Sequence, residues 1–313
     1  MKNIPLKPLI LLSVFAIFAL SCSDDDRNQE PEHTVNNFAD FDLQGHRGAR
    51  GLLPENTIPS LLEALKYHVN TLEFDVVVTR DSLILVSHEP WFHHDISTHP
   101  DGRPVRAQEF VGTNIFRMTY EETQQFDVGQ RGHERFPEQQ PMAVTKPLMK
   151  DAVRAVDEYS LENGLPLVDF SIELKSSPEW YNEFVPESEK FVKLAHSEIM
   201  ELGIRDRTIL QSFDVNILKE MRKLDEEIRI AYLINNENSF EENMDLLGFT
   251  PEIYSPNFRL VDENLVKKAH DAGMLIIPWT INEIEDMEKI IATGVDGLIT
   301  DYPNRAAEIL GRK

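Results

Sequence analysis

Apolar runs rich in β-branched residues alternate with amphipathic helical stretches along most of this 313-residue chain. Eight runs are predicted to be strands: 40–45, 71–75, 167–174, 208–212, 228–233, 252–255, 275–280 and 296–300. Four glycines fall where the intervening helices would have their C-caps: Gly164, Gly203, Gly273 and Gly294. This alternation favours a (β/α)8 barrel over an open doubly wound sheet, whose first strand normally leads through a glycine-rich turn directly into a helix.

One strand-like run does not fit the alternation. The run LILVSH (83–88) begins four residues after VVVT (76–79), and a parallel crossover needs a dozen or more residues. The two runs are therefore predicted to form an antiparallel hairpin that turns near Arg80 and Asp81. A two-residue turn would place His88 opposite Glu73, within one register step.

The segment from Glu89 to Thr145 is too long to be an ordinary connection between barrel elements. It contains a short helical piece around TYEETQQF (119–126). We expect an insertion over the C-terminal mouth of the barrel, where long loops commonly shape the substrate pocket. Its aromatic residues either form an apolar lid or pack the insertion onto the barrel: Trp91, Phe92, Phe110 and Phe116.

The first 21 residues are predicted to be a signal peptide rather than part of the fold. Lys2 and Lys7 form a short basic region, 9–20 is an apolar run too short for a stable membrane span, and small residues precede Cys22. Because Cys22 is the single cysteine, no intramolecular disulfide can form. The segment resembles a bacterial lipobox, which implies a lipid anchor on Cys22. The alternative is an ordinary cleavage site with an incidental cysteine.

Residues 22–40 are expected to be an acidic tether, and residues 41–313 a single barrel domain. The acidic start of the tether resembles the export tag of surface lipoproteins, so we expect an exported protein anchored to a bacterial outer membrane. The formal charge is −23, and loss of the positive charges of Lys2 and Lys7 makes it −25. A chain this acidic is a poor nucleic-acid binder, and an anionic substrate would require local cations and a metal.

Polar side chains lie at the predicted C-terminal ends of the strands, where barrel enzymes hold their sites. They are His46, Arg47, Glu73, Asp75, Glu173, Lys175, Gln211, Trp279, Asn282 and Asp301. Glu73 and Asp75 are two residues apart and share a strand face, as do Glu173 and Lys175. Three carboxylates crowded at one barrel mouth resist ionisation unless a cation joins them, and their oxygen atoms suit Mg²⁺ or Ca²⁺. The alternative is ion pairing with Arg47 and Lys175.

Two histidines are expected to reach the same place, His46 at the end of the first strand and His88 through the hairpin. Imidazole titrates near neutral pH, which suits proton transfer. With Arg47 and Lys175 placed on phosphoryl oxygens, this set of groups would suit phosphoryl transfer. The other histidines are interpreted as ordinary surface or core residues.

A series of motifs in this chain resembles the glycerophosphodiester phosphodiesterases, barrel relatives of bacterial phosphoinositide phospholipase C. The motifs are GHRG with PENT, EFDVVVTRD, LVSHEP, SIELK, QSFD, PWTIN and GVDGLITDYP, in family order over residues 43 to about 305. The chain departs from the family where His88 is followed by Glu89 instead of aspartate, and where an Arg-Thr-Thr run is absent after it. These departures leave the choice of substrate open.

The resemblance implies roles for individual residues. His46 and His88 would be the acid/base pair, Glu73, Asp75 and Glu173 the metal ligands, and Arg47 and Lys175 the phosphate-binding groups, with Glu55, Gln211 and Trp279 lining the pocket. It also implies attack by the substrate's glycerol hydroxyl, giving a cyclic phosphate that water opens. Asn56 or Thr57 would cap the helix that Pro59 begins, and we favour the cap as the role of Asn56.

The expected activity is metal-dependent hydrolysis of glycerophosphodiesters to sn-glycerol 3-phosphate and an alcohol. An alternative within the same barrel is a phosphodiesterase directed at lysophospholipids or phosphoinositides. A second alternative is a non-catalytic lipoprotein that binds glycerol phosphates. No protein partner is implied.

Overall fold

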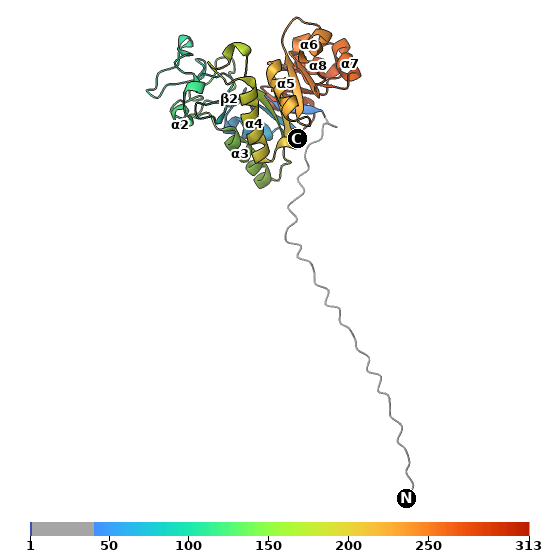
Figure 1. Cartoon of the computed structure of the whole chain (residues 1–313), viewed down its shortest axis with the longest axis horizontal. Helices are drawn as coiled ribbons and strands as arrows, with labels where there is room; N and C mark the ends of the chain where they lie inside the picture. The colour runs from blue at the N-terminus through green and yellow to red at the C-terminus, as the bar shows by residue number, and fades with distance from the viewer. Residues whose placement is uncertain (2–40, 313) are drawn as a thin grey trace. The chain divides into compact units, whose positions relative to one another are not determined.

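The computed structural model describes residue 1 and residues 41–312 (Figure 1). Within these residues eight parallel strands form one sheet in the order β8-β7-β6-β5-β4-β2-β1-β9. The strands are β1 Asp42–Gly45, β2 Thr71–Val78, β4 Asp169–Leu174, β5 Thr208–Ser212, β6 Arg229–Ile234, β7 Ile253–Pro256, β8 Leu275–Ile276 and β9 Gly297–Thr300. The predicted signal peptide, most of the tether and Cys22 lie outside the described residues.

Backbone hydrogen bonds between β9 and the segment that follows β8 close the sheet. Asp296 N–H donates to Ile276 O at 3.0 Å, and Ile299 N–H donates to Pro278 O at 2.9 Å. β8 is shorter than the predicted strand 275–280, but backbone bonds to β7 continue beyond it, from Ile277 N–H to Tyr254 O and from Trp279 N–H to Pro256 O, each at 3.1 Å. The chain is therefore a (β/α)8 barrel, as predicted.

Helices follow the strands and cover the outside of the barrel (Figure 1). They are α1 Ile58–Leu65, α3 Met149–Asn163, α4 Ser188–Leu202, α5 Val215–Leu224, α6 Phe240–Leu247, α7 Glu263–Asp271, α8 Ile284–Ala292 and α9 Pro303–Ile309, with 3-10 turns η3 Pro178–Trp180, η4 Arg205–Arg207 and η5 Phe258–Leu260. Gly164 and Gly203 are the left-handed C-caps of α3 and α4, as predicted. The caps of α7 and α8 are Ala272 and Thr293, and the predicted glycines follow one residue later.

The predicted hairpin is present. β3 (Ile84–Val86) pairs antiparallel with β2 and places Val76 opposite Val86. Ser82 N–H donates to Thr79 O at 2.9 Å and closes the turn around Arg80 and Asp81. Continued past the end of β3, this register sets position 88 opposite position 74, within the one-step tolerance of the prediction.

The hairpin separates two apolar cores. Val76 and Val78 belong to the main core between the barrel and its helices, whereas Val77 and Leu85 belong to a second core that includes the fully buried Phe92 of the insertion. The insertion carries η1 (Ala107–Glu109), η2 (Ile115–Arg117) and α2 (Tyr120–Thr123), and it extends to one side of the barrel in Figure 1. Phe92 thus packs the insertion onto the barrel instead of forming a lid.

A layer of apolar side chains fills the barrel interior beneath the strand ends. It consists of Ile209, Ala231, Ile253, Ile277 and Ile299. Strand alternation points residues two positions further along to the same side, so this layer supports Gln211, Trp279 and Asp301 at the mouth.

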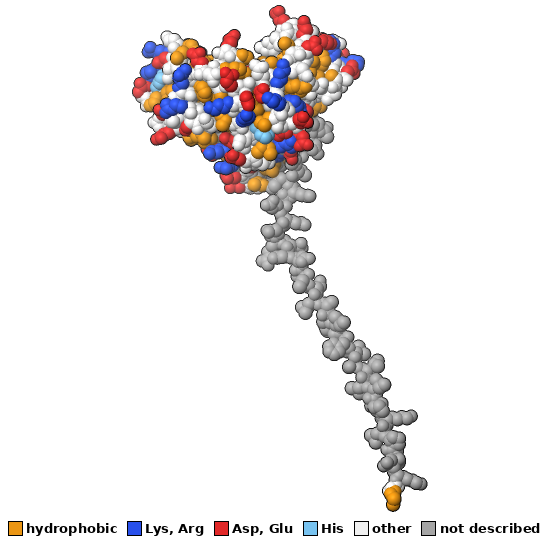
Figure 2. Space-filling view, viewed as in Figure 1, with side chains coloured by type: hydrophobic (Ala, Val, Ile, Leu, Met, Phe, Trp, Pro, Cys, Tyr) orange, Lys and Arg blue, Asp and Glu red, His pale blue; other side chains and the backbone are white. Residues whose placement is uncertain are grey.

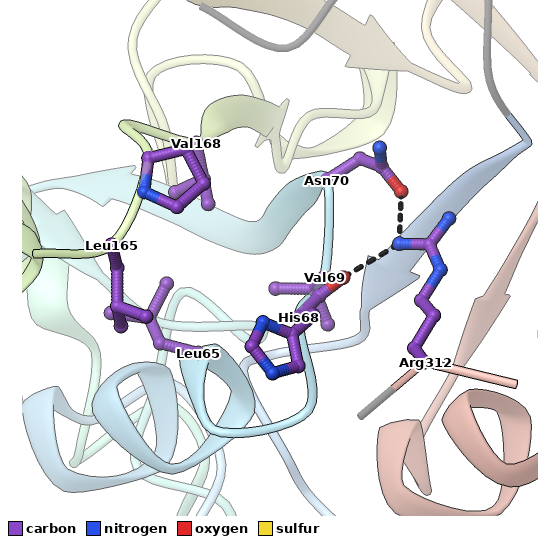
Figure 3. Close-up of a pocket in the computed structure, with 8 residues that line it drawn as sticks. Leu65, His68, Val69, Asn70, Leu165, Val168 and Arg312 are labelled. Carbon is purple, nitrogen blue, oxygen red and sulfur yellow. Dashed lines mark hydrogen bonds between the residues drawn. The ribbon is translucent and has the colours of Figure 1, made fainter. Parts of the chain in front are cut away.

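The opposite end of the barrel holds a separate cavity of about 290 Å³ (Figure 3). Arg312 lies at its edge and donates to His68 O at 2.6 Å and to Asn70 Oδ1. The surface mixes both signs of charge, with Lys and Arg interspersed among Asp and Glu on the face in Figure 2. No helix within the described residues is long and apolar enough to cross a membrane.

Candidate active site

Three carboxylates meet at the C-terminal ends of adjacent strands. Glu73 and Asp75 end up on one face of β2, and the parallel register pairs Asp75 with Glu173 of β4. All three side chains are buried, and one carboxylate oxygen of each lies within 4.8 Å of the others. The structure therefore brings the predicted ligand residues together.

These carboxylates repel one another in a buried site. Burial and the nearby acids raise the pKa of Glu73 well above its usual value, and burial raises that of Glu173 to about 7. The pKa of Asp75 stays low despite burial because His88, Arg47 and Lys175 favour its charged form. Asp75 Oδ1 accepts no hydrogen bond within the described residues.

The donor set fits a hard divalent cation. All three side chains offer oxygen atoms, and a cation among them would offset the mutual repulsion that burial intensifies. The unsatisfied Asp75 oxygen faces this cluster, 3.7 Å from Lys175 Nζ. The acidic cluster could therefore hold one metal ion.

Asn56 holds Asp75 in place instead of capping α1, so the predicted cap role is wrong. Its Nδ2 donates to Asp75 Oδ2 at 2.8 Å, and its Oδ1 accepts from Asp75 N–H at 3.1 Å. Thr57 is the N-cap and accepts from Ser60 N–H. Asn56 has a positive φ of 56°, a conformation that asparagine adopts more readily than most residues and that turns its amide toward β2.

His46 is oriented by a carboxylate that follows the neighbouring strand, β9. Its Nδ1 lies 2.6 Å from Asp301 Oδ1, and Asn282 Nδ2 donates to Asp301 Oδ2 at 2.7 Å. The pKa of Asp301 is lowered because, against burial, His46 favours its charged form. An ionised carboxylate can only accept, so His46 Nδ1 carries the proton and Nε2 is the free base, 3.9 Å from Glu73 Oε2.

His88 is also held by a carboxylate, that of the next residue, Glu89. Its Nδ1 lies 2.5 Å from Glu89 Oε1, and Lys175 Nζ lies 3.1 Å from its Nε2. Burial, Arg47 and Lys175 lower the pKa of His88 to about 4, and burial lowers that of His46. Both imidazoles are therefore neutral near pH 7 and each presents Nε2 toward the carboxylate cluster or its lysine.

Arg47 and Lys175 provide positive charge beside the carboxylates. Arg47 Nη1 lies 2.7 Å from Glu55 Oε1 and its Nε lies 3.4 Å from Asp75 Oδ2, while Lys175 Nζ lies 2.7 Å from Glu173 Oε1. The turn after β1 requires Gly48, which has φ 84° and whose added Cβ would lie 2.5 Å from the Ser60 carbonyl carbon. The backbone N–H of Arg47 donates to Glu73 Oε2 at 2.9 Å, which holds this turn against β2.

These groups surround a cavity of about 220 Å³ at the mouth of the barrel. Its lining consists of His46, Arg47, Arg50, Glu73, His88, Glu173, Lys175, Gln211, Phe213, Leu233, Trp279, Thr280 and Ile299. Gln211 donates to Glu73 Oε1 at 2.8 Å, and the Trp279 ring packs edge-on against Phe213. Glu55 does not line this cavity, contrary to the prediction. It lies behind Arg47 and Arg50 and is ion-paired with both.

Comparison with known proteins shows the family of this chain. Residues 46–305 match the glycerophosphoryl diester phosphodiesterase family. The chain belongs to this family. A glycerophosphodiester phosphodiesterase from Bacillus altitudinis is 28% identical over 268 residues, which cover 84% of this chain and 96% of that protein. Family membership makes the chain a phosphodiesterase.

Two further proteins are similar to this chain. A human lysophospholipase D is 24% identical over 83% of this chain and 82% of its own length. The structure of an Oleispira antarctica phosphodiesterase in complex with the product sn-glycerol-3-phosphate has a TM-score of 0.68 at 20% identity, covering 87% of this chain and 97% of that one. At that identity the likeness shows the shared barrel fold.

The sequence alone did not reveal the contacts or roles of several residues of this phosphodiesterase site. Asp301 is visible as a polar residue after the last strand, but its contact with His46 spans 255 positions. Glu89 was visible only as a departure from the family pattern. Arg50 and Phe213 lie in loops without periodicity, and only the folded barrel places them in the cavity.

Proposed function

We propose that the chain hydrolyses glycerophosphodiesters to sn-glycerol 3-phosphate and an alcohol. The observation that carries this proposal is the pair of neutral histidines, each held by a carboxylate, on a cavity that also contains three clustered acids. The relative named glycerophosphodiester phosphodiesterase and the neighbour bound to sn-glycerol-3-phosphate support it.

The proposed reaction has two steps. In the first, one imidazole Nε2 takes the proton of a glycerol hydroxyl, whose oxygen bonds to phosphorus while the bond from phosphorus to the alcohol oxygen breaks. The other imidazole donates a proton to that leaving oxygen. In the second step water opens the cyclic phosphate, and the two rings exchange roles. The phosphate anion favours protonation of an adjacent ring, which offsets the low pKa of His88 in the free protein.

Arg47 and Lys175 would bind the phosphoryl oxygens and stabilise the charge that develops during each step. Asp301 and Glu89 keep the proton on Nδ1 of each ring, so that Nε2 is the atom that accepts a proton. Phe213 and Trp279 pack edge-on against each other and give the cavity an apolar aromatic surface.

We further propose that Glu73, Asp75 and Glu173 hold one divalent cation, Mg²⁺ or Ca²⁺. When bound, it would supply Lewis-acid polarisation of a phosphoryl oxygen. The oxygen-only donor set and the unsatisfied Asp75 oxygen support a hard ion.

Release of sn-glycerol 3-phosphate from a panel of deacylated phospholipids, with and without chelator, tests this function. We expect turnover that chelator abolishes and that Mg²⁺ or Ca²⁺ restores. Replacement of His46 by alanine should abolish turnover while leaving the fold and cation binding intact. Unchanged turnover of that variant would contradict the proton-transfer role, and binding of glycerol phosphates without turnover would favour the non-catalytic alternative.

A lysophospholipid substrate is the second candidate because an aromatic cluster lies on the loops that follow His88 and Lys175. The Trp91 ring centroid lies 5.7 Å from that of Phe110, 5.8 Å from that of Trp180 and 5.5 Å from that of Phe184. Phe110 is 40% exposed and could contact an acyl chain. Hydrolysis of lysophosphatidylcholine but not of glycerophosphocholine would favour this candidate over the main proposal.

We also propose that the chain is exported and anchored to the outer membrane through a lipid on Cys22. The support is the basic and apolar leader that precedes the single cysteine. Labelling cells with a tagged fatty acid should mark the wild-type chain and not Cys22→Ser. Equal labelling of both would contradict the anchor.

A further inference from the structure

Arg50 is a buried arginine on the wall of the catalytic cavity that the proposed chemistry leaves unused. It is 7% exposed and lines the cavity next to His46 and Arg47. Its Nε is ion-paired with Glu55, and Gln139 Nε2 donates to its backbone oxygen at 2.7 Å. The main chain and the inner part of this side chain are therefore fixed.

The outer part of the same side chain has no protein partner. Within the described residues no protein group bonds its two terminal nitrogens, Nη1 and Nη2, which stay accessible to solvent, whereas Nε is buried and has no partner beyond the ion pair. Accessible guanidinium N–H groups that no protein group occupies can donate charge-assisted hydrogen bonds to a bound anion. Burial lowers the pKa of Arg50, and Arg47 and Arg135 act in the same direction. The pKa of Arg47 is instead raised, because surrounding carboxylates outweigh its burial.

Arg50 is also the inner member of a group of basic side chains around Phe136 of the insertion. The Arg50 guanidinium carbon lies 4.6 Å from the Phe136 ring centroid, that of Arg135 lies 5.8 Å away, and the His133 ring packs edge-on at 4.9 Å. Arg135 forms no ion pair within the described residues and bonds only His133. We call Arg50, His133 and Arg135 the basic wall.

The outer members of the basic wall line a second cavity of about 270 Å³. His133 and Arg135 line this second cavity together with His94, Asp95, Arg131 and Glu134. Asp95 is already paired with His94, at 3.3 Å. The catalytic cavity is also lined by Phe213, Leu233, Trp279 and Ile299, which offer little to a charged group. Its charged lining consists of the carboxylates of Glu73 and Glu173 and the cations of Arg47, Arg50 and Lys175.

We propose that Arg50 binds an anionic group on the alcohol part of the substrate, so that the enzyme prefers glycerophosphodiesters whose leaving alcohol carries a negative charge. Arg47 and Lys175 serve the scissile phosphate, and the free nitrogens of Arg50 bind a phosphate or carboxylate beyond it, with Arg135 at the outer end. This inference rests on the proposed phosphodiesterase activity of the same cavity.

The test compares kcat/KM for glycerophosphoinositol and glycerophosphoinositol 4-phosphate, which differ only in one added phosphate. For the wild-type chain we expect the phosphorylated substrate to be favoured at least about tenfold, the effect of one additional charge-assisted hydrogen bond. Arg50→Met should bring the ratio close to one, Arg50→Lys should restore part of it, and Arg135→Met, at an exposed position, should reduce it partly.

Arg222→Met is a matched control, because Arg222 also stacks on an aromatic ring, that of Phe249, but is paired with Glu252 away from the cavity. It should leave the ratio unchanged. An equal loss on both substrates in Arg50→Met would overturn the proposal and assign Arg50 to the scissile phosphate. A wild-type ratio near one would also overturn it. Absence of turnover on both substrates by the wild-type chain would instead mark failure of the proposed phosphodiesterase function.

Discussion

Replacement of Asp301 by asparagine should invert the tautomer of His46. Asp301 Oδ1 accepts from His46 Nδ1 at 2.6 Å, and its Oδ2 accepts from Asn282 Nδ2 at 2.7 Å. The side-chain amide of Asn282 cannot flip, because its Oδ1 accepts from the backbone N–H of residue 301 at 3.0 Å. An asparagine at 301 must therefore offer its oxygen to Asn282 and its amide group to His46. The ring would then carry its proton on Nε2, the atom that the proposed mechanism needs free.

The size of the fall in kcat follows from the loss of the hydrogen bond between His46 and the ionised Asp301. Asp301 is 3% exposed, and a hydrogen bond between an ionised group and its partner in such a site contributes about 1.5–3 kcal/mol. Loss of that contribution in the transition state lowers kcat by about 10- to 150-fold. KM should change little, because Asp301 does not line the cavity.

The assay is steady-state release of sn-glycerol 3-phosphate by Asp301→Asn. Asp42→Asn is a suitable control, because Asp42 is a buried carboxylate on the strand that leads to His46 but lies at the other end of it. The control should keep wild-type kcat. Wild-type kcat in Asp301→Asn, with the chain folded, would refute the argument that Asp301 sets the tautomer.

Three further predictions concern stability and the acidic cluster. Burial raises the pKa of Asp42 from 3.8 to about 6, so the folded chain loses stability as the pH rises from about 4 to about 6. Denaturant titration should show Asp42→Asn to be more stable than wild type by up to about 3 kcal/mol at pH 8 and by little at pH 4. Asn56→Gly keeps the positive φ but removes both hydrogen bonds to Asp75, and titration calorimetry should show cation affinity falling about 10- to 100-fold. Millimolar Mg²⁺ or Ca²⁺ should raise the Tm of the wild-type chain, an increase that Glu173→Gln should largely lose; equal increases in both would contradict the assigned ligands.

The barrel was predictable because its signals are local and repeated. Strand alternation places Glu73 and Asp75 on one face, and the C-terminal ends of parallel strands share one edge, so the meeting with Glu173 follows from the fold class. The hairpin was predictable from a gap too short for a crossover. His88 could therefore be placed near the acids without knowledge of the insertion.

The supporting contacts could not be predicted in the same way. Asn56 could cap a helix or bind a neighbouring strand with the same amide, and only the positive φ in the folded turn decides between them. Glu55 was expected at the cavity wall, but the position of Arg50 between Glu55 and Phe136 depends on how an aperiodic insertion folds back. Such contacts join segments with no common periodicity, so no pattern in the sequence reports them.

The double role of the β2–β3 hairpin limits how this chain can be shortened. Val77 and Leu85 face the insertion, whereas Val76 on the same ribbon faces the core between the barrel and its helices. Excising residues 90–145 would expose the apolar side chains of Val77 and Leu85 on the strand that presents Glu73 and Asp75, and the shortened chain should aggregate. A minimal version of this enzyme would need polar replacements at positions 77 and 85 together with the deletion.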